Sequence, residues 1–323
     1  MTTLPKQGKG VLRPLLYIHD NAGLAQMWAA AARSVLPAYE ICTDLEGVDP
    51  ARITVALVWK PPPGFLASLP NLRLVVCIGA GVDHIVLSDP EFPRHIPLVR
   101  MVDPGLTHGM CDYVVWACLS LLRRARHYAG EQAKAAWERQ PLPPSSARRV
   151  LVLGLGEIGA AAARTLRAQG FEVSGWSRGP KQLPGIKTYA GSPDLPTALA
   201  QADILVNLLP ATPQTQGLMD AAFFAHCAPG AAVVNAGRGA TVDEEALLSA
   251  LDAGKISAAV LDVFQVEPLP ADHRFWAHPC VTVTPHNAAI THPDSGIHAL
   301  CRAVEALEAG QPLPNLVDWE RGY

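Results

Sequence analysis

The sequence lacks the features that mark several large classes of protein. Its 323 residues carry a formal net charge of only −3 and form no long basic run, so neither nucleic acid nor an anionic membrane surface is indicated as a partner. No uninterrupted apolar stretch reaches the length that crosses a membrane, and the first ten residues contain no apolar signal-peptide core. We therefore expect a cytoplasmic protein that binds neither nucleic acid nor membrane.

Cysteine and histidine are present, but their spacing does not suit a metal site. The seven cysteines are odd in number, scattered, and never spaced as CxxC, while the 11 histidines include no HExxH motif. This pattern disfavours a disulfide framework and a zinc centre, and it favours small reduced cysteines in the core. No metal is expected.

A glycine-rich turn is the strongest local signal in the chain. It follows an apolar run over 148–153 that predicts a buried strand, and it leads into an alanine-rich stretch over 158–167 that predicts a helix. The turn consists of Gly154, Leu155, Gly156, Glu157, Ile158 and Gly159. Here the first glycine permits the tight turn, the second lets the backbone approach a pyrophosphate, and the third lets helix and strand pack closely. We interpret the turn as a dinucleotide site; a chance glycine turn is the alternative that this context disfavours.

The end of the next predicted strand, over 171–176, bears on the choice of coenzyme. NAD-binding folds usually place an acidic residue there for the ribose hydroxyls, whereas this chain has Ser177 and Arg178, with Lys181 close behind. A hydroxyl donor and a guanidinium suit a 2′-phosphate, and no carboxylate would repel it. The residues favour NADP(H), with NAD(H) as the second choice; that Arg178 is only a solvated loop cation is the simpler alternative.

The order of the predicted elements indicates two α/β lobes. Before the glycine turn, strands are expected over 15–19, 53–59 and 72–78, and helices over 22–36, 106–128 and 132–139. After it, strands are expected over 204–208, 231–235, 258–261 and 281–283, and helices over 243–253 and 295–309. We expect the last helix to return to the first lobe and complete it.

The predicted fold is therefore α/β, with two Rossmann-like lobes that contain parallel sheets. A doubly wound dinucleotide-binding domain, residues 104–286, would be inserted in a smaller flavodoxin-like substrate domain, residues 1–103 and 287–323. Ligands are expected at the carboxyl ends of the strands, because open α/β sheets bind them there.

Arg238 is the first candidate catalytic residue. It lies between Gly237 and Gly239, just after the predicted strand over 231–235. A guanidinium at that edge of the sheet can bind a carboxylate and polarise a neighbouring carbonyl. The alternative is a structural salt bridge.

His286 and Glu267 are the candidates for proton transfer. His286 follows Pro285 at the end of the last predicted strand. Reduction of a ketone by hydride leaves an alkoxide, and an imidazolium is suited to protonate it near neutral pH. A carboxylate from Glu267 would orient the imidazole and favour its protonated form. Taken singly, the histidine could be a packed or surface residue, and the glutamate an exposed loop residue.

These segments also resemble the D-isomer-specific 2-hydroxyacid dehydrogenases. The similarity lies in 235–239, 261–264, Glu267-Pro268 and 284–286, and it extends through 79–83 and 208–212 to nearly the whole chain. Within that family, the branch of glyoxylate/hydroxypyruvate reductases of the A type is resembled through 56–62, 176–178, 207–210 and 321–323.

The resemblance implies roles for particular residues. Arg238 would bind the substrate carboxylate and carbonyl, His286 would be the acid/base, and Glu267 would tune it. The main chain of Ala80, Gly81 and Val82 would bind the carboxylate, and Trp59 would cap a small pocket, although a plain core tryptophan is equally compatible with its type. Coenzyme contacts are expected from Asp262 at the nicotinamide amide, from Thr212 near the adenosine, and from Leu209, Pro210, Ala236, Gly237, Arg238 and His286.

The expected activity is NADPH-dependent reduction of small 2-oxo acids by hydride transfer, from glyoxylate to glycolate or from hydroxypyruvate to D-glycerate. Two alternatives stay open: a non-catalytic, corepressor-like module that senses a dinucleotide, and a different 2-hydroxyacid or formate dehydrogenase. The apolar stretch over 113–122, together with the resemblance, predicts a homodimer.

Overall fold

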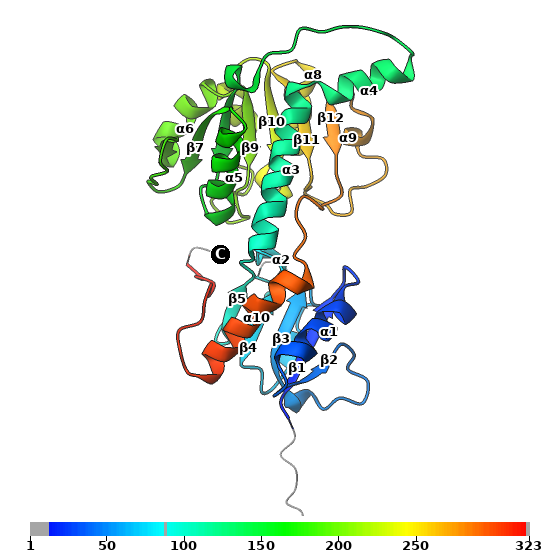
Figure 1. Ribbon diagram of the computed structural model, residues 1–323, viewed down its shortest axis with the longest axis vertical. Coiled ribbons are helices and arrows are strands. Elements are labelled where there is room, and N and C mark those ends of the chain that lie inside the picture. Colours follow the sequence, from blue (N-terminus) through cyan, green and yellow to red (C-terminus); the bar gives the residue numbers. More distant parts are fainter. Residues whose placement is uncertain (1–12, 87–88, 321–323) are drawn as a thin grey trace, which may run out of the picture. The chain divides into compact units, whose positions relative to one another are not determined.

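The computed structural model describes residues 13–86 and 89–320, which divide into two compact units (Figure 1). One unit comprises residues 1–105 and 291–323, and the other comprises residues 106–290. The sequence places these boundaries after residues 103 and 286. The first ten residues and the closing Arg321-Gly322-Tyr323, both considered above, lie outside the described residues.

The first unit is built on a five-stranded parallel sheet in the order β2-β1-β3-β4-β5. This is the strand order of flavodoxin-like doubly wound sheets. The strands are β1 (Leu15–Asp20), β2 (Glu40–Cys42), β3 (Ile53–Trp59), β4 (Leu74–Cys77) and β5 (Leu98–Arg100). The helices are α1 (Ala25–Val35), α2 (Asp83–Val86) and α10 (Pro293–Glu308), with single 3-10 turns η1 (Pro50–Arg52) and η2 (Leu66–Ser68).

Both faces of this sheet are covered. Val55 and Leu57 of β3 pack in a core with α1 and α10. Val58 of the same strand points to the opposite face of the sheet, where it packs in a second core. Helix α10 lies beside α1 although the two are far apart in the sequence (Figure 1). A Cβ atom at Gly296 would lie 2.5 Å from the Trp28 ring, so glycine permits this close packing. The chain thus returns after the second unit to complete the first.

The second unit contains a seven-stranded parallel sheet in the order β12-β11-β10-β9-β6-β7-β8. The strands are β6 (Arg149–Leu153), β7 (Glu172–Ser177), β8 (Lys187–Ala190), β9 (Ile204–Asn207), β10 (Ala231–Asn235), β11 (Ile256–Leu261) and β12 (Val281–Val283). The helices are α3 (Pro104–Leu122), α4 (Ala125–Ala133), α5 (Glu157–Ala168), α6 (Gly191–Ala200), α7 (Ala221–His226), α8 (Glu244–Asp252) and α9 (Arg274–Ala277), with 3-10 turns η3 (Ser145–Ala147) and η4 (Gly239–Thr241).

The central strand of this sheet is β9, and the direction of strand addition reverses between β9 and its neighbour β6. Val150 and Val152 face a core formed with α3 and α5, while Leu151 and Leu153 face a core formed with α6, α7 and α8. Such a sheet, with helices on both faces, binds ligands outside the carboxyl ends of its strands at the reversal point. The prediction of parallel strands in a doubly wound sheet is confirmed.

Two helix predictions are wrong. The expected helix over 106–128 is interrupted after Leu122, because Arg124 has a φ of 54° and a left-handed residue cannot continue a right-handed helix. The expected helix over 132–139 ends at Ala133, and Ala135 also has a positive φ, of 53°. The chain from there to η3 has no regular secondary structure.

Seven helices and strands of the structure were not predicted: β2, β5, β8, α2, α6, α7 and α9. Strand β8 is a four-residue edge strand that begins with Lys187, so it lacks the apolar run of the central strands. Helix α6 contains Pro193 and Pro196, which are signals of a turn rather than of a helix. Helix α9 is a single turn of four residues, which is too short for a helical period of apolar residues to show in the sequence.

Two further findings concern membranes and metals. In the two described ranges, no helix combines the length and the apolar character needed to cross a membrane. Those same residues contain no group of three or more histidine, cysteine, aspartate or glutamate side chains placed to hold a metal ion.

Candidate active site

The glycine turn connects β6 to α5, and its three glycines have different surroundings. Gly154 has a φ of 96°, which favours glycine, and a Cβ atom at Gly159 would lie 1.8 Å from the Gly154 carbonyl oxygen. The chain itself therefore requires both residues. Gly156, the N-cap of α5, differs because a Cβ atom there would meet nothing within 4 Å. Its main chain faces open space at a helix amino end, which fits the close approach of a pyrophosphate.

Glu157 and Ile158 form the first turn of α5, as the motif requires. Leu155 is buried and lies against Gly175 of β7, where a Cβ atom would be 2.5 Å from the leucine side chain. The turn is thereby attached to the neighbouring strand. The residues present fit a dinucleotide at the carboxyl end of β6.

Ser177, Arg178 and Lys181 lie where β7 ends. The Ser177 hydroxyl donates to the Gly179 carbonyl at 2.8 Å, so its proton serves the loop rather than an outside ligand. Arg178 and Lys181 are exposed. Within the described part of the chain, no ion pair joins either cation to a carboxylate.

The loop after β9 carries the next predicted coenzyme residues, Leu209, Pro210 and Thr212. Leu209 and Thr212 are buried. Thr215 holds the loop in shape: its hydroxyl donates to the Pro210 carbonyl at 2.6 Å and accepts from the Thr212 main-chain N–H at 2.9 Å. The loop is thus stabilised from within.

Arg238 follows β10 on a loop that packs closely against its neighbours. A Cβ atom at Gly237 would lie 2.8 Å from the Leu209 carbonyl oxygen, and one at Gly239 would lie 1.9 Å from the Phe264 carbonyl carbon. Ala236, between β10 and this loop, is buried. The Arg238 side chain is half-buried, and its Nη1 donates to the Gly237 carbonyl at 2.8 Å. The two flanking glycines therefore let the arginine lie at the meeting point of three strand ends.

A buried polar network underlies this loop, and the sequence did not reveal it. Asn207 at the end of β9 donates to Asn235 Oδ1 at 2.9 Å and to Thr241 Oγ1 at 2.7 Å. Thr241 in turn donates to the Arg238 carbonyl at 2.6 Å, and Asn207 Oδ1 accepts from the Leu209 N–H at 3.2 Å. The network ties the loop after β9 to the loop that carries Arg238. The available signal was an asparagine that closes each of two apolar strands, since a buried amide needs partners.

His286 and Glu267 are brought together, although 19 positions separate them. Imidazole Nδ1 lies 2.7 Å from Glu267 Oε2, and the other carboxylate oxygen accepts from the Phe264 N–H at 3.1 Å. The two side chains are 32% and 21% exposed, so the pair is accessible to a ligand while the glutamate is held in place. A carboxylate bound to Nδ1 sets the orientation of the ring.

Asp262 is fully buried directly after β11. It accepts hydrogen bonds from the Thr284 hydroxyl at 2.6 Å, from the Asn287 N–H at 3.0 Å and from the Ala288 N–H at 2.9 Å. Three donors thus stabilise the buried carboxylate. The sequence had suggested only a contact with the nicotinamide amide.

Trp59, Ala80, Gly81 and Val82 belong to the first unit, whereas Arg238, Glu267 and His286 belong to the second. Trp59 ends β3 and lies beside the turn that follows β4: a Cβ atom at Gly79 would be 2.3 Å from its ring. Val82 is buried, so its side chain belongs to the core, while Ala80 and Gly81 are partly exposed. The structure therefore brings the predicted substrate residues of this unit together.

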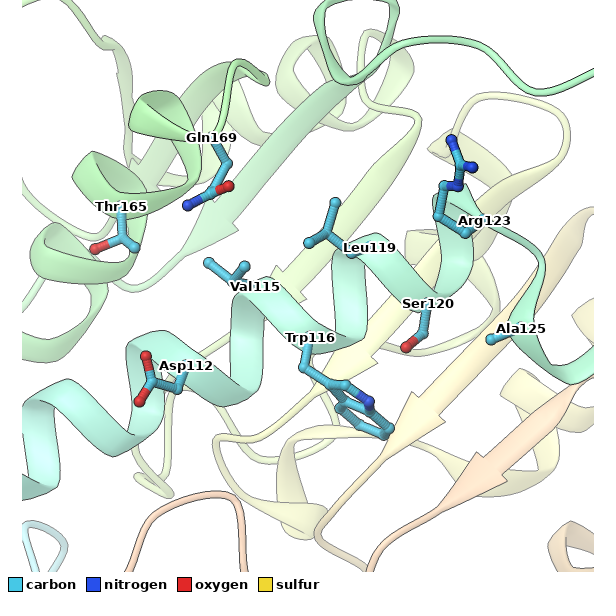
Figure 2. A pocket seen from close by; sticks show the side chains of 9 residues that line it. All are labelled: Asp112, Val115, Trp116, Leu119, Ser120, Arg123, Ala125, Thr165 and Gln169. Atoms are coloured by element: carbon cyan, nitrogen blue, oxygen red, sulfur yellow. The ribbon is translucent and has the colours of Figure 1, made fainter.

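A groove of about 530 Å³ lies on the second unit, along the outer side of α3. Figure 2 shows Val115, Trp116 and Leu119 of α3, and across from this helix Thr165 of α5 and Gln169, which directly follows α5. Trp116 is 44% exposed there. None of the predicted catalytic or coenzyme residues lines this groove.

Known proteins of similar sequence identify the family of this chain. Residues 115–288 match the model of the D-isomer specific 2-hydroxyacid dehydrogenase family, NAD binding domain. A glyoxylate/hydroxypyruvate reductase A of Yersinia enterocolitica is 40% identical over 305 residues, which cover 93% of this chain and 96% of that protein. A similar protein of Serratia proteamaculans, with the same name, is also 40% identical over the same shares of the two chains.

Solved structures give the same result. A D-isomer specific 2-hydroxyacid dehydrogenase from Xanthobacter autotrophicus, in complex with NADPH and MES, superposes with a TM-score of 0.91 at 40% identity, over 97% of this chain and 100% of that one. An NADPH-dependent glyoxylate/hydroxypyruvate reductase from Sinorhizobium meliloti, in complex with NADP and sulfate, has a TM-score of 0.88 at 37% identity over the same shares. The chain belongs to the D-isomer-specific 2-hydroxyacid dehydrogenase family.

Proposed function

We propose that this protein is an NADPH-dependent reductase of small 2-oxo acids, which converts glyoxylate to glycolate and hydroxypyruvate to D-glycerate. The observation that carries the proposal is the 2.7 Å pair of His286 and Glu267 in the same unit as the glycine turn. A proton donor and a dinucleotide turn are the two parts that ketone reduction by hydride requires. The names of the relatives at about 40% identity support the choice of substrate.

Held at the glycine turn, NADPH would supply the hydride for C2 of the oxo acid. Arg238 binds the substrate carboxylate through its guanidinium and polarises the carbonyl, which lowers the energy of the developing alkoxide. His286 then donates a proton to that oxygen. We assign Nε2 as the donor, because Nδ1 is engaged by Glu267.

Substrate selection is assigned to the first unit. The main chain of residues 80–82 would bind the substrate carboxylate, and the Trp59 ring would limit the size of the 2-substituent. The Trp59 ring lies 4.1 Å from the ring of His84, centroid to centroid, and it packs on Gly79, so its position is well defined. A rigid aromatic wall disfavours bulky 2-oxo acids.

Preference for NADP(H) over NAD(H) is assigned to Arg178, with Lys181 as a second cation. Arg178 directly follows β7 and Lys181 lies further along the same loop, at the edge of the sheet where the 2′-phosphate of the coenzyme belongs in this type of fold. Their exposure keeps them available for a ligand. The NADPH and NADP in the similar structures support the same choice.

The active form is proposed to be a homodimer in the cytoplasm. The groove beside α3 contains the exposed Trp116, and Trp137, on the irregular segment after α4, is 93% exposed. Burial of such large apolar side chains favours association with a second copy of the chain. The seven cysteines, all within the described residues, form no disulfide with one another, which suits a reducing compartment. Sedimentation at twice the 34.4 kDa chain mass would support the dimer, and sedimentation as a monomer would refute it.

A spectrophotometric assay of NADPH oxidation tests the activity. Glyoxylate and hydroxypyruvate are expected to be reduced efficiently, pyruvate less so, and branched 2-oxo acids least. Tight NADPH binding without turnover of any oxo acid would instead favour a dinucleotide-sensing module. Reduction of NADP by formate would favour a formate dehydrogenase.

A further inference from the structure

A chain of three hydrogen-bonded side chains lies directly behind His286. Tyr113, in the middle of α3, places its hydroxyl 2.7 Å from Thr284 Oγ1. Thr284, which follows β12, places the same Oγ1 2.6 Å from Asp262 Oδ1. The three residues come from separate segments of the second unit. The mechanism above gives none of them a part in proton transfer.

The chemistry of the groups determines the direction of this chain. A carboxylate only accepts, so the Thr284 hydroxyl must donate its single proton to Asp262. Thr284 Oγ1 can then only accept from Tyr113, which is therefore the donor. Burial and the charge of Asp262 raise the pKa of Tyr113, against the opposing effect of its hydrogen bond with Thr284, so the phenol keeps its proton.

Asp262, the last of the three hydrogen-bonded side chains, holds the main chain at His286 and directly after it. Its carboxylate accepts from the N–H groups of Asn287 and Ala288, and its main-chain carbonyl accepts from the His286 N–H at 2.8 Å. His286 has a φ of 52°, a left-handed conformation that residues other than glycine seldom adopt. The imidazole reaches Glu267 from this conformation.

We infer that Tyr113 and Thr284 are positioning residues for proton transfer: they orient the Asp262 carboxylate, which fixes the left-handed main chain of His286 and so aims its imidazole. This inference rests on the proposed function, since it concerns the same proton donor. Without the Thr284 hydroxyl, Asp262 loses one of its three donors to the carboxylate and can rotate away from the N–H groups that follow His286. The histidine would remain present but would be aimed less well, which reduces turnover more than coenzyme binding.

The test compares three variants of the full-length protein with NADPH and glyoxylate: Tyr113→Phe, Thr284→Val and the conservative Thr284→Ser. Tyr189→Phe is the matched control, because it also removes one hydroxyl that donates to a single side chain, Gln201, in the same unit. The readouts are kcat, KM, the Kd for NADPH from fluorescence titration, and the melting temperature.

The inference expects kcat to fall about fivefold in Tyr113→Phe, consistent with the loss of one hydrogen bond, and about 10- to 100-fold in Thr284→Val through misplacement of the donor. Thr284→Ser is expected to restore most of kcat, and the Kd for NADPH is expected to stay close to that of the wild type in all variants. Unchanged kcat in Tyr113→Phe and Thr284→Val, or equal losses in Tyr189→Phe, would overturn the inference.

A double-mutant cycle separates positioning from general stability. If Tyr113 acts through His286, the change Tyr113→Phe has no further effect on kcat once His286→Gln is present. Equal effects in both backgrounds would overturn the inference and would indicate a structural role. The failure of the proposed function has a different signature, because His286→Gln alone would then retain wild-type turnover.

Discussion

The glycine turn after β6 and the trio of Arg238, Glu267 and His286 belong to one sheet, but the protein builds them by different means. The turn requires residues without a side chain: a Cβ atom at Gly159 would overlap the Gly154 carbonyl oxygen. The trio depends on side chains held by other side chains, such as Glu267 on His286 at 2.7 Å. One part is shaped by the local backbone, and the other by contacts between distant segments.

This difference predicts which substitutions would disrupt the turn and which would disrupt the trio. A glycine turn is sensitive to any added side chain near it, but it needs few partners elsewhere. The trio tolerates changes in local sequence as long as the supporting network, including Asn207 and Thr241 beneath Arg238, stays intact. Coenzyme binding and proton transfer should therefore be separable by mutation.

The largest expected effect separates the two parts at His286. His286→Gln keeps a polar side chain of similar size but removes the proton donor, so kcat should fall by about 10²- to 10⁴-fold while NADPH binding persists. Steady-state assays and a fluorescence titration check both halves. His226→Gln, exposed at the end of α7, is the matched control. Normal turnover in His286→Gln would remove the acid/base role.

The second prediction breaks the turn in two ways. Gly159→Ala should lower the free energy of unfolding by about 1–3 kcal/mol, because its Cβ atom overlaps the Gly154 carbonyl. Gly156→Ala should leave the free energy of unfolding within about 0.5 kcal/mol, since the space there is open. It should nevertheless weaken NADPH binding about tenfold, which corresponds to about 1.4 kcal/mol. Urea unfolding and coenzyme titration measure the two quantities; undiminished NADPH binding by Gly156→Ala would mean that no pyrophosphate approaches this residue.

The third prediction concerns the far end of the coenzyme. Arg178→Ala should weaken NADPH binding about tenfold and leave NADH binding nearly unchanged, because only NADPH carries the 2′-phosphate. Arg164→Ala, an exposed arginine on α5, controls for the loss of one positive charge. Equal losses for the two coenzymes in Arg178→Ala would reject the phosphate-binding role.

The smallest effect on stability is expected at the amino ends of the strands. Neither the glycine turn nor the catalytic trio lies there. Asp203, before β9, accepts from the Arg149 main chain at 2.8 Å and from its guanidinium at 2.8 and 3.1 Å. Burial alone would raise the pKa of Asp203, but the hydrogen bonds and charge of Arg149 outweigh it and lower the pKa below its usual value.

A lowered pKa in the folded state means that the contribution of Asp203 to stability is present above its unfolded value, about 3.9, and is lost as the pH falls through the folded value. Asp203→Asn should therefore cost less than about 1 kcal/mol at pH 7, because the pair is partly exposed. The difference from the wild type should shrink at low pH in urea unfolding experiments. A loss of kcat in this variant would show that the two ends of the strands are not independent.

The regions that could be predicted from the sequence are those where short-range pattern decides the structure. The apolar runs of β6 and β10, bounded by charge and glycine, predict central strands because both faces of such strands are buried. Prediction failed where tertiary contacts decided: Arg124 breaks the long helix although its residue type favours helix, and β8 pairs as an edge strand with little apolar pattern.

The candidate site divides in the same way. Arg238, Glu267 and His286 were identified one by one from residue type and position, and by resemblance. The supporting residues Tyr113, Asn207 and Thr241 were not, because a tyrosine in an apolar helix or an asparagine after a strand looks like an ordinary core residue until its partner is known.

By itself, the sequence determined the parallel α/β architecture and the dinucleotide turn, since the period of apolar residues and the absence of Cβ atoms act over a few neighbouring residues. Only the tertiary structure decided which donors surround Asp262 and which amide and hydroxyl groups support the loop of Arg238. The physical reason is that a buried polar group is stable only with partners, and these partners come from segments that the fold alone brings within hydrogen-bonding distance.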